Sequence, residues 1–120
     1  MKRFYLREIA HARAGDKGDT SNIGVIAYKA EYYPVVLAQV TPERVREHFR
    51  GIAKGPISRY ELPQLHAINL VLERALAGGV TRSLSLDPHG KSYSALILTM
   101  TVEVDDAIAA DLMKAGRRPL

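Results

Sequence analysis

One polar segment, residues 14–22, places the strongest constraint on how this chain can fold. It reads AGDKGDTSN and separates two apolar runs. This favours the tip of a β-hairpin, because glycine accepts positive φ and Asp, Thr, Ser and Asn bond back to the backbone in turns. An ordinary hairpin loop needs only about two to five residues. The length and charge of the segment therefore indicate a functional site, with a charged, well-capped loop as the structural alternative.

The side chains of this segment suit several ligands. Asp16 and Asp19 offer carboxylates to a cation, Lys17 offers an ammonium to an anion, and the backbone offers N–H groups to a phosphate. The spacing matches no Walker loop, EF-hand or dinucleotide fingerprint. Lys17 neutralises the two acids more simply than Mg²⁺ would, and the histidines lack zinc-ligand spacing, so we predict no metal site. The candidate catalytic residues are Asp16, Lys17 and Asp19, because a carboxylate beside an ammonium can do acid–base work once burial moves its pKa toward neutrality.

Composition limits the classes of protein to which the chain can belong. Its 120 residues are expected to form one domain, residues 1–120, long enough to bury a core. A net charge of +4 with scattered basic residues suits a small anion such as a carboxylate or phosphate, or a solubilising surface, and no motif supports nucleic-acid binding. No apolar run reaches the length of a membrane span, and Arg7 and Glu8 interrupt the first apolar residues, so we expect neither membrane insertion nor a signal peptide. The absence of cysteine excludes disulfides and thiolate nucleophiles, and a cytoplasmic protein is expected.

Periodicity and chain-breaking residues divide the chain into strands and helices. Thr41, Pro42 and Glu43 form the clearest helix start, with a capping side chain, a proline in the first turn and an acid. Gly24 lies inside an expected strand, which indicates a bulge or the close approach of another group. The expected strands are residues 4–13, 22–28, 56–62, 80–87 and 92–104; the expected helices are 34–40, 42–51, 64–77 and one capped by Asp105; Asp87-Pro88-His89-Gly90 predicts a type I turn.

The expected helix 64–77 carries a polar residue on its apolar stripe. Asn69 shares that face and must bond a backbone group of the sheet or reach a site, because an unpaired buried amide costs about 1–3 kcal/mol. The apolar residues of the stripe are Leu65, Ile68, Leu72 and Leu76.

The order of elements predicts an α+β fold. Two hairpins enclose two helical crossovers, and right-handed crossovers place both main helices on the same side of the sheet. We therefore expect a two-layer sandwich of ferredoxin-like character, with a mixed five-stranded sheet and the helices on one face. The other face is solvated or meets another chain, so a homo-oligomer is expected. Phe49, Leu72, Leu84 and Leu98 are the predicted core residues.

Three motifs resemble one known family. The chain is similar to the C-terminal domain of the acyclic terpene utilisation (AtuA-like) family over residues from about 6 to 102, and differs from it mainly at Ala14, where serine is usual, and in its last residues. The motifs are the run from His11 to Ala27, the segment Arg59-Tyr60-Glu61-Leu62-Pro63 followed by Asn69, and Gly78-Gly79-Val80 with Leu86-Asp87-Pro88-His89-Gly90-Lys91.

The resemblance implies a ferredoxin-like fold and a role beside a larger protein. In the family this domain follows a larger N-terminal domain, so the chain resembles a stand-alone version. The family implies a part in bacterial catabolism of acyclic terpenoid or other branched acyl-CoA compounds, with acyl-CoA as substrate and no cofactor assigned. The chain would then be the small subunit of an acyl-CoA-processing enzyme of lyase or hydratase type. The alternative is a non-catalytic structural domain that assembles with a larger AtuA-like partner or with copies of itself.

Further polar residues within these motifs are candidates for substrate binding. Arg59 could hold a carboxylate in a bidentate pair. It shares a strand face with Glu61, however, and an ordinary ion pair on the sheet explains the two residues equally well. The candidate substrate-binding residues are His11, Arg13, Asn22, Arg59, Glu61 and Asn69.

Overall fold

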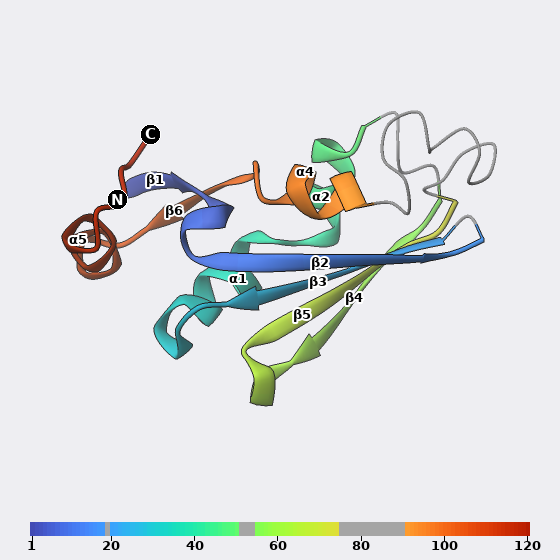
Figure 1. Ribbon diagram of the computed structural model, residues 1–120, viewed down its shortest axis with the longest axis horizontal. Helices are drawn as coiled ribbons and strands as arrows, with labels where there is room; N and C mark the ends of the chain where they lie inside the picture. Colours follow the sequence, from blue (N-terminus) through green and yellow to red (C-terminus); the bar gives the residue numbers. More distant parts are fainter. Residues whose placement is uncertain (19, 51–54, 75–90) are drawn as a thin grey trace.

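The computed structural model describes residues 1–18, 20–50, 55–74 and 91–120 (Figure 1). Its strands are β1 (Lys2–Tyr5), β2 (Ala10–Lys17), β3 (Thr20–Ala27), β4 (Ile57–Leu62), β5 (Ala67–Leu72) and β6 (Thr101–Val104). Its helices are α1 (Tyr33–Gln39), α2 (Pro42–His48), α4 (Lys91–Ile97) and α5 (Asp106–Lys114), with short 3₁₀ turns at Leu6–Glu8, Ala30–Tyr32 and Pro63–Leu65. No helix among the described residues is long and apolar enough to cross a membrane.

The α+β class is confirmed, but the strands form two sheets. In the described part of the chain, a four-stranded antiparallel sheet has the order β2-β3-β5-β4, and β1 pairs with β6 in a separate antiparallel ribbon. The expectation of one mixed five-stranded sheet is therefore wrong. The expected first strand, residues 4–13, is broken by the 3₁₀ turn at Leu6–Glu8, which lets β1 leave the larger sheet.

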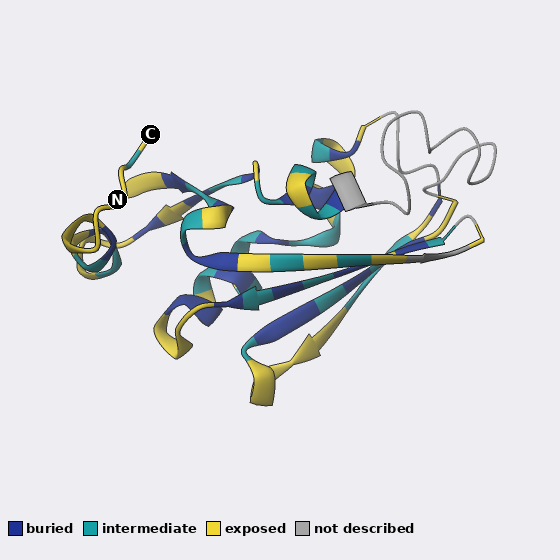
Figure 2. Ribbon diagram, viewed as in Figure 1, coloured by how far each residue is buried: buried dark blue, intermediate teal, exposed yellow. Residues whose placement is uncertain are grey.

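One face of the four-stranded sheet is covered by helices, as expected. The helix α4 lies against β2, α1 lies over β3 and β5, and α2 lies against β4. Figure 2 shows the resulting contrast between the buried residues of β3 and β5 and the exposed positions on β2 and β4. This helix-covered face carries the apolar residues Ile23, Val25, Ile68, Leu70 and Leu72, all fully buried.

We call the opposite face of the sheet the open face. Strict alternation along the strands determines which residues lie on it. Gly24 of β3 pairs with Arg13 of β2 on one side and with Asn69 of β5 on the other, and Asn69 pairs with Tyr60 of β4. These four residues form one row across the sheet. Arg13 and Tyr60 are exposed, and Gly24 and Asn69 are half-buried.

The expected helix 64–77 is wrong, because residues 67–72 form the strand β5. The chain makes only a 3₁₀ turn at Pro63–Leu65, and His66 then adopts a left-handed conformation with φ 52°, which stops a right-handed helix. Leu65, placed on the apolar stripe by the helical spacing, is 64% exposed. The buried residues of the segment instead alternate as Ile68, Leu70 and Leu72.

The expected strand 92–104 is correct only at its end. Residues 91–97 form α4, and β6 starts at Thr101. Tyr93, Ile97 and Met100 are buried, a spacing of four and then three that fits a helix and its exit, whereas Leu98 is only partly buried. The expected strand 80–87, the turn at 87–90 and the core position Leu84 lie outside the described residues.

The remaining helices follow their predicted caps. Thr41 Oγ1 accepts a hydrogen bond from the Arg44 N–H at 3.2 Å, and Asp105 accepts one from the Ile108 N–H at 2.8 Å, so α2 and α5 start where the sequence indicates. Phe49, just after α2, is buried as predicted.

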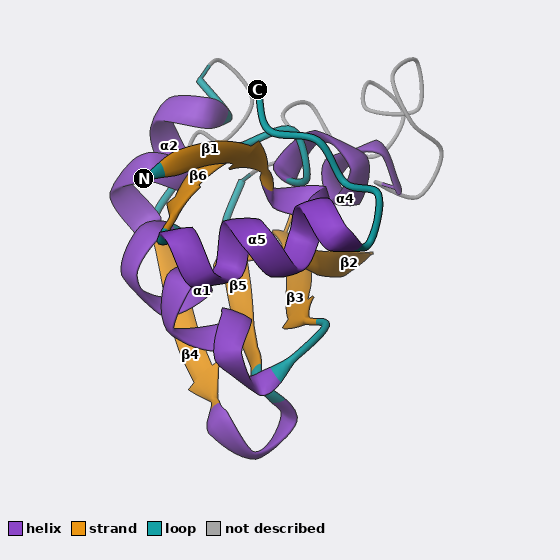
Figure 3. Cartoon of the chain, turned by 90° about the vertical axis from the view of Figure 1, so that its left-hand side faces the viewer, coloured by secondary structure: helices purple, strands orange, loops and turns teal. Residues whose placement is uncertain are grey.

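The β1–β6 ribbon is fastened to α1 by side chains. In Figure 3 the ribbon crosses above α1 and α5. The Gln39 amide donates to the Glu103 carbonyl at 2.7 Å and accepts from the Glu103 N–H at 2.8 Å, which reproduces a strand pairing along the edge of β6. On α5, Asp111 accepts a bond from Lys29 at 2.8 Å and another from the Tyr32 hydroxyl.

Candidate functional site

The polar segment 14–22 is mostly strand and not a long loop. Lys17 pairs with Thr20 and Asp16 with Ser21, which leaves only residues 18 and 19 between the two strands. Gly18 has φ +60°, the conformation that such a tight hairpin turn requires and that glycine supplies without strain. The interpretation of the segment as an extended charged loop is therefore wrong. Asp19 and the side chains of Asp16 and Lys17 lie outside what the structure describes, so their catalytic role stays a prediction.

A hollow of about 510 Å³ lies on the open face, beside this hairpin. It is lined from three adjacent strands by Arg13, Asn22, Gly24, Ile26 and Asn69, with Ala14, Gly15 and Thr20 toward the turn. We call it the Gly24 hollow. It brings together three of the predicted substrate-binding residues, Arg13, Asn22 and Asn69.

The hollow exists because its central residue has no side chain. A Cβ placed on Gly24 would meet a single atom within 4.0 Å, the Ile26 Cδ1, so the space above the glycine is open. Arg13 and Asn69 are the direct cross-strand neighbours of Gly24, and such neighbours have Cα atoms about 4.5–5.5 Å apart. The two polar side chains therefore stand on either side of a flat glycine floor.

The polar side chains around the Gly24 hollow are not used to hold the fold. Among the described residues, Arg13, Asn22 and Asn69 have no hydrogen bond or ion pair through their side chains. A guanidinium donates in a planar fork that matches a carboxylate or phosphate, and an amide both donates and accepts. The described lining of the hollow carries one cationic side chain, Arg13, and no carboxylate, a set of groups that suits an anionic ligand.

His11 lies on the same face, one row further from the turn. It pairs with Ile26 of β3, and its ring stacks on Tyr28 with ring centres 5.4 Å apart. The imidazole thus borders the Gly24 hollow at Ile26 without lining it.

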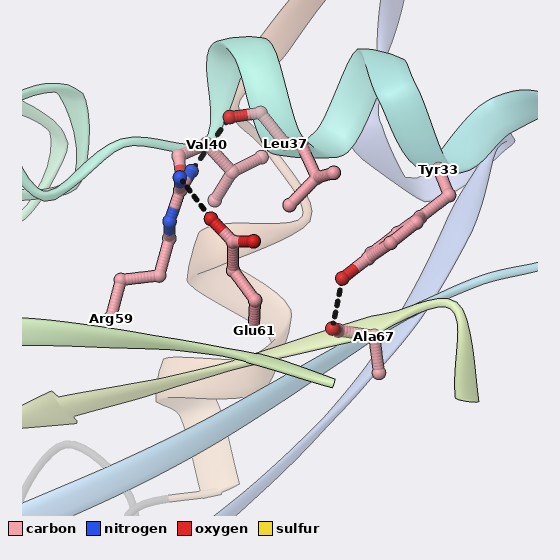
Figure 4. A network of polar contacts seen from close by, with 6 residues as sticks. All are labelled: Tyr33, Leu37, Val40, Arg59, Glu61 and Ala67. Atoms are coloured by element: carbon pink, nitrogen blue, oxygen red, sulfur yellow. Dashed lines mark hydrogen bonds and ion pairs between the residues drawn. The ribbon is translucent and has the colours of Figure 1, made fainter. Parts of the chain in front are cut away.

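Arg59 and Glu61 face the helices and not the hollow (Figure 4). Arg59 Nη1 donates to the carbonyls of Leu37 at 2.7 Å and Val40 at 3.0 Å, and Nη2 lies 3.3 Å from a carboxylate oxygen of Glu61. Arg59 and Glu61 do not line the Gly24 hollow, because Arg59 pairs with the inward-facing Leu70, and their role in substrate binding stays a prediction. Arg59 instead satisfies carbonyls at the C-terminal end of α1, which have no partner within the helix.

Tyr60 is the residue of the site region that the sequence reasoning missed. It lies between Arg59 and Glu61 and therefore points the other way, onto the open face in the row of Asn69 and Gly24. Strand alternation at residues 56–62 contained this signal. Within the described ranges, no group of three or more histidine, aspartate or glutamate side chains is placed to hold a metal ion.

Comparison with known proteins gives one match. A family model described as the AtuA ferredoxin-like domain matches residues 4–103, which include every described element from β2 to α4, half of β1 and three of the four residues of β6. No curated protein and no solved structure matches the chain significantly.

Proposed function

The chain belongs to the AtuA ferredoxin-like domain family, and from this premise we propose that it is a small subunit or stand-alone domain of an AtuA-type system that binds an anionic ligand in the Gly24 hollow. The proposed setting is the breakdown of acyclic terpenoids or other branched acyl-CoA compounds. The ligand is then an acyl-CoA or the carboxylate derived from it.

The observation that supports this proposal is the group of uncommitted polar side chains around a glycine floor. Arg13 supplies a positive charge, and Asn22 and Asn69 supply donors and acceptors at the side of the same hollow. Ile26 adds an apolar surface next to them. Binding sites for small molecules combine these elements, a mostly apolar concave surface with a few converging polar groups that fix orientation.

A catalytic step would draw its acid–base groups from the hairpin end of the same two strands. Asp16 and Lys17 end β2, and Asp19 follows two positions later in the sequence. The proposed reaction is of lyase or hydratase type, in which a proton is moved at a carbon beside the thioester carbonyl. Such a proton transfer is the task for which a positioned carboxylate or amine is suited.

A second candidate is a non-catalytic domain that docks on a larger AtuA-like partner. It is favoured by three large apolar side chains, Tyr28, Leu62 and Leu65, which are 53%, 41% and 64% exposed. They are close together at one end of the sheet, where Leu62 pairs with Ala67 and the Ala27 N–H donates to the His66 carbonyl at 2.9 Å. Exposed apolar groups that gather in this way are typical of interaction surfaces.

Calorimetric titration with a branched acyl-CoA tests the binding proposal. Arg13→Ala and Asn69→Ala should each weaken binding about tenfold or more, because a charge-assisted hydrogen bond is worth about 1.5–3 kcal/mol. Arg118→Ala removes the same charge from an exposed position near the end of the chain and should bind as the unaltered protein does. Equal affinities for all the variants would overturn the assignment of the ligand to the hollow.

Two hairpin variants separate catalysis from structure. If Lys17 and Asp19 are catalytic, Lys17→Ala and Asp19→Asn should abolish turnover in the assembled system and change stability by no more than about 0.5 kcal/mol. If the hairpin only stabilises the fold, the same changes should lower the free energy of unfolding by about 1–3 kcal/mol and spare activity.

For the docking candidate, the corresponding test is co-purification with a larger AtuA-like chain, compared between the unaltered protein and Leu65→Ser.

A further inference from the structure

The strand β4 is the last strand of the four-stranded sheet, and its outer edge has no partner strand among the described residues. In the described residues it pairs with β5 alone. The Glu73 N–H donates to the Pro56 carbonyl at 3.0 Å, so Pro56 belongs to the positions whose backbone groups point at β5. Because these positions alternate in an antiparallel pair, the N–H and C=O groups of Arg59 and Glu61 point away from the sheet. Unpaired groups of this kind are a template for another strand.

The charges along this edge are complementary to themselves. Arg59 and Glu61 lie on either side of Tyr60. If a second β4 runs antiparallel about a twofold axis at Tyr60, Arg59 of each copy lies opposite Glu61 of the other, and both ion pairs form at once. A twofold interface requires this property, since each residue meets its own complement on the second copy.

Within one copy the two side chains are paired with each other. Arg59 Nη1 donates to the carbonyls of Leu37 and Val40, and Nη2 lies 3.3 Å from a carboxylate oxygen of Glu61, with the Arg59 side chain 18% exposed. In the proposed dimer, Nη2 of Arg59 exchanges Glu61 of its own copy for Glu61 of the other copy. The Glu61 side chain is 52% exposed, so its carboxylate can be approached from outside. On the open face, Tyr60 and Leu62 are 57% and 41% exposed. In the proposed register Tyr60 is covered by Tyr60 of the second copy, and Leu62 by Ser58.

We propose that two copies of this chain associate through their β4 edges, in register about Tyr60, and join their four-stranded sheets into one antiparallel sheet. The row Arg13, Gly24, Asn69 and Tyr60 then continues directly into Tyr60 of the second copy. Two Gly24 hollows lie on the same face of the joined sheet.

Disulfide trapping tests this register directly, since the chain has no cysteine of its own. Tyr60→Cys places the two thiols directly opposite each other, with Cβ atoms about 4.5–5.5 Å apart, and should give a covalent dimer under mild oxidation. Leu62→Cys is the matched control: its two thiols are offset by four residues, or about 13 Å along the strands, and should remain reduced. A mixture of Ser58→Cys and Leu62→Cys proteins should cross-link, because position 58 of one copy faces position 62 of the other.

Charge reversal supplies a second, independent readout. Sedimentation should show a dimer for the unaltered protein at micromolar concentration, and Glu61→Arg should raise the dissociation constant at least tenfold by placing like charges opposite each other. Glu31→Arg makes the same charge change at an exposed residue away from β4 and should leave the dimer intact. The proposal is overturned if the unaltered protein is monomeric at about 100 µM, if Glu61→Arg dimerises as tightly as Glu31→Arg, or if neither the Tyr60→Cys protein nor the 58/62 mixture cross-links faster than Leu62→Cys alone.

Discussion

Arg59 and Tyr60 are neighbours in sequence, yet the two faces of the sheet give them opposite surroundings. On the helix-covered face, Arg59 is held by the carbonyls of Leu37 and Val40 and by Glu61. On the open face, the polar residues around Gly24 have no such partners among the described residues. Polar side chains therefore differ between the two faces: Arg59 satisfies backbone groups of the fold, whereas those around Gly24 are accessible to a ligand.

This difference explains why residue type alone is a poor guide to function in this chain. Arg59, near the end of α1, completes the bonding of helix carbonyls, whereas Arg13, beside Gly24, has no side-chain partner among the described residues. The alternation of the strands decides which of these applies. The two faces should consequently respond to mutation in opposite ways, with stability lost on one and binding lost on the other.

The largest effect is expected in the core of the helix-covered face. Leu72→Ala should reduce the free energy of unfolding by about 2–5 kcal/mol, because Leu72 is fully buried and its truncation leaves a cavity. Val71→Ala alters the adjacent, half-buried residue of the open face and should cost clearly less. Urea denaturation of both variants makes the comparison, and equal costs would show that the two faces are equally covered.

The next effect separates the two arginines. Arg59→Ala should cost about 1–3 kcal/mol, because it leaves the carbonyls of Leu37 and Val40 without their donor, and should leave ligand affinity unchanged. Arg13→Ala should do the reverse, with a stability change within about 0.5 kcal/mol and a loss of binding. Thermal melting and ligand titration of both variants test these opposite effects. Our assignment is reversed if Arg59→Ala loses ligand binding while Arg13→Ala binds as tightly as the unaltered protein.

A smaller effect on stability is expected from filling the Gly24 hollow. Gly24→Ala should leave the protein as stable as before or up to about 0.5–1 kcal/mol more stable, since glycine weakens a strand and a Cβ here is in ordinary contact with Ile26. Gly24→Val should occupy the floor and abolish binding. Gly55→Ala is the contrasting glycine, because its Cβ would lie 2.5 Å from the Glu73 carbonyl oxygen and the backbone would have to shift.

The smallest effect lies away from both faces and concerns pH. Hydrogen bonds from Lys29 and Tyr32 hold the pKa of Asp111 below its ordinary value of 3.8. The folded state therefore favours the charged carboxylate, and this contribution is fully present above about pH 4 and is lost as the pH falls through the lowered pKa. The difference in melting temperature between the unaltered protein and Asp111→Asn should be constant from pH 5 to 7 and should shrink in acid. The substitution should leave ligand affinity at the Gly24 hollow unchanged.

Local signals predicted part of this fold correctly. The hairpin of β2 and β3, the caps at Thr41 and Asp105 and the existence of a strand at β4 all follow from local signals that act over a few positions. The two large errors exchanged a strand for a helix and a helix for a strand. Residues 65–72 contain leucines and isoleucine at both helical and alternating spacing, so periodicity cannot choose between the two. The tertiary structure decides for a strand, because β5 pairs with the edge of β3 that β2 leaves free.

The candidate site shows the same limit. Arg13, Asn22 and Asn69 were identified one by one, but their meeting point depends on the register between β2, β3 and β5, which no short segment contains. Asn69 in particular was assigned to a helix face, whereas it stands on a strand opposite Gly24. Arg59 does not line the Gly24 hollow because successive strand residues face opposite sides of the sheet, and its neighbour Tyr60 takes the open face.

The pairing of β1 with β6 sets an order of events during synthesis. The four-stranded sheet needs only residues 10–72, whereas β1 at Lys2–Tyr5 has no partner strand until Thr101–Val104 has been made. Contacts between segments so far apart close slowly, so the ribbon should be the last part of the fold to form. Until then Phe4, which is fully buried in the finished protein, lacks its β6 partner Val102, and the N–H of the equally buried Leu6 lacks the Met100 carbonyl as its acceptor. A chain released from the ribosome before residue 101 would therefore keep these apolar residues without their partners, and we expect such truncated products to be captured by chaperones or proteases rather than to accumulate.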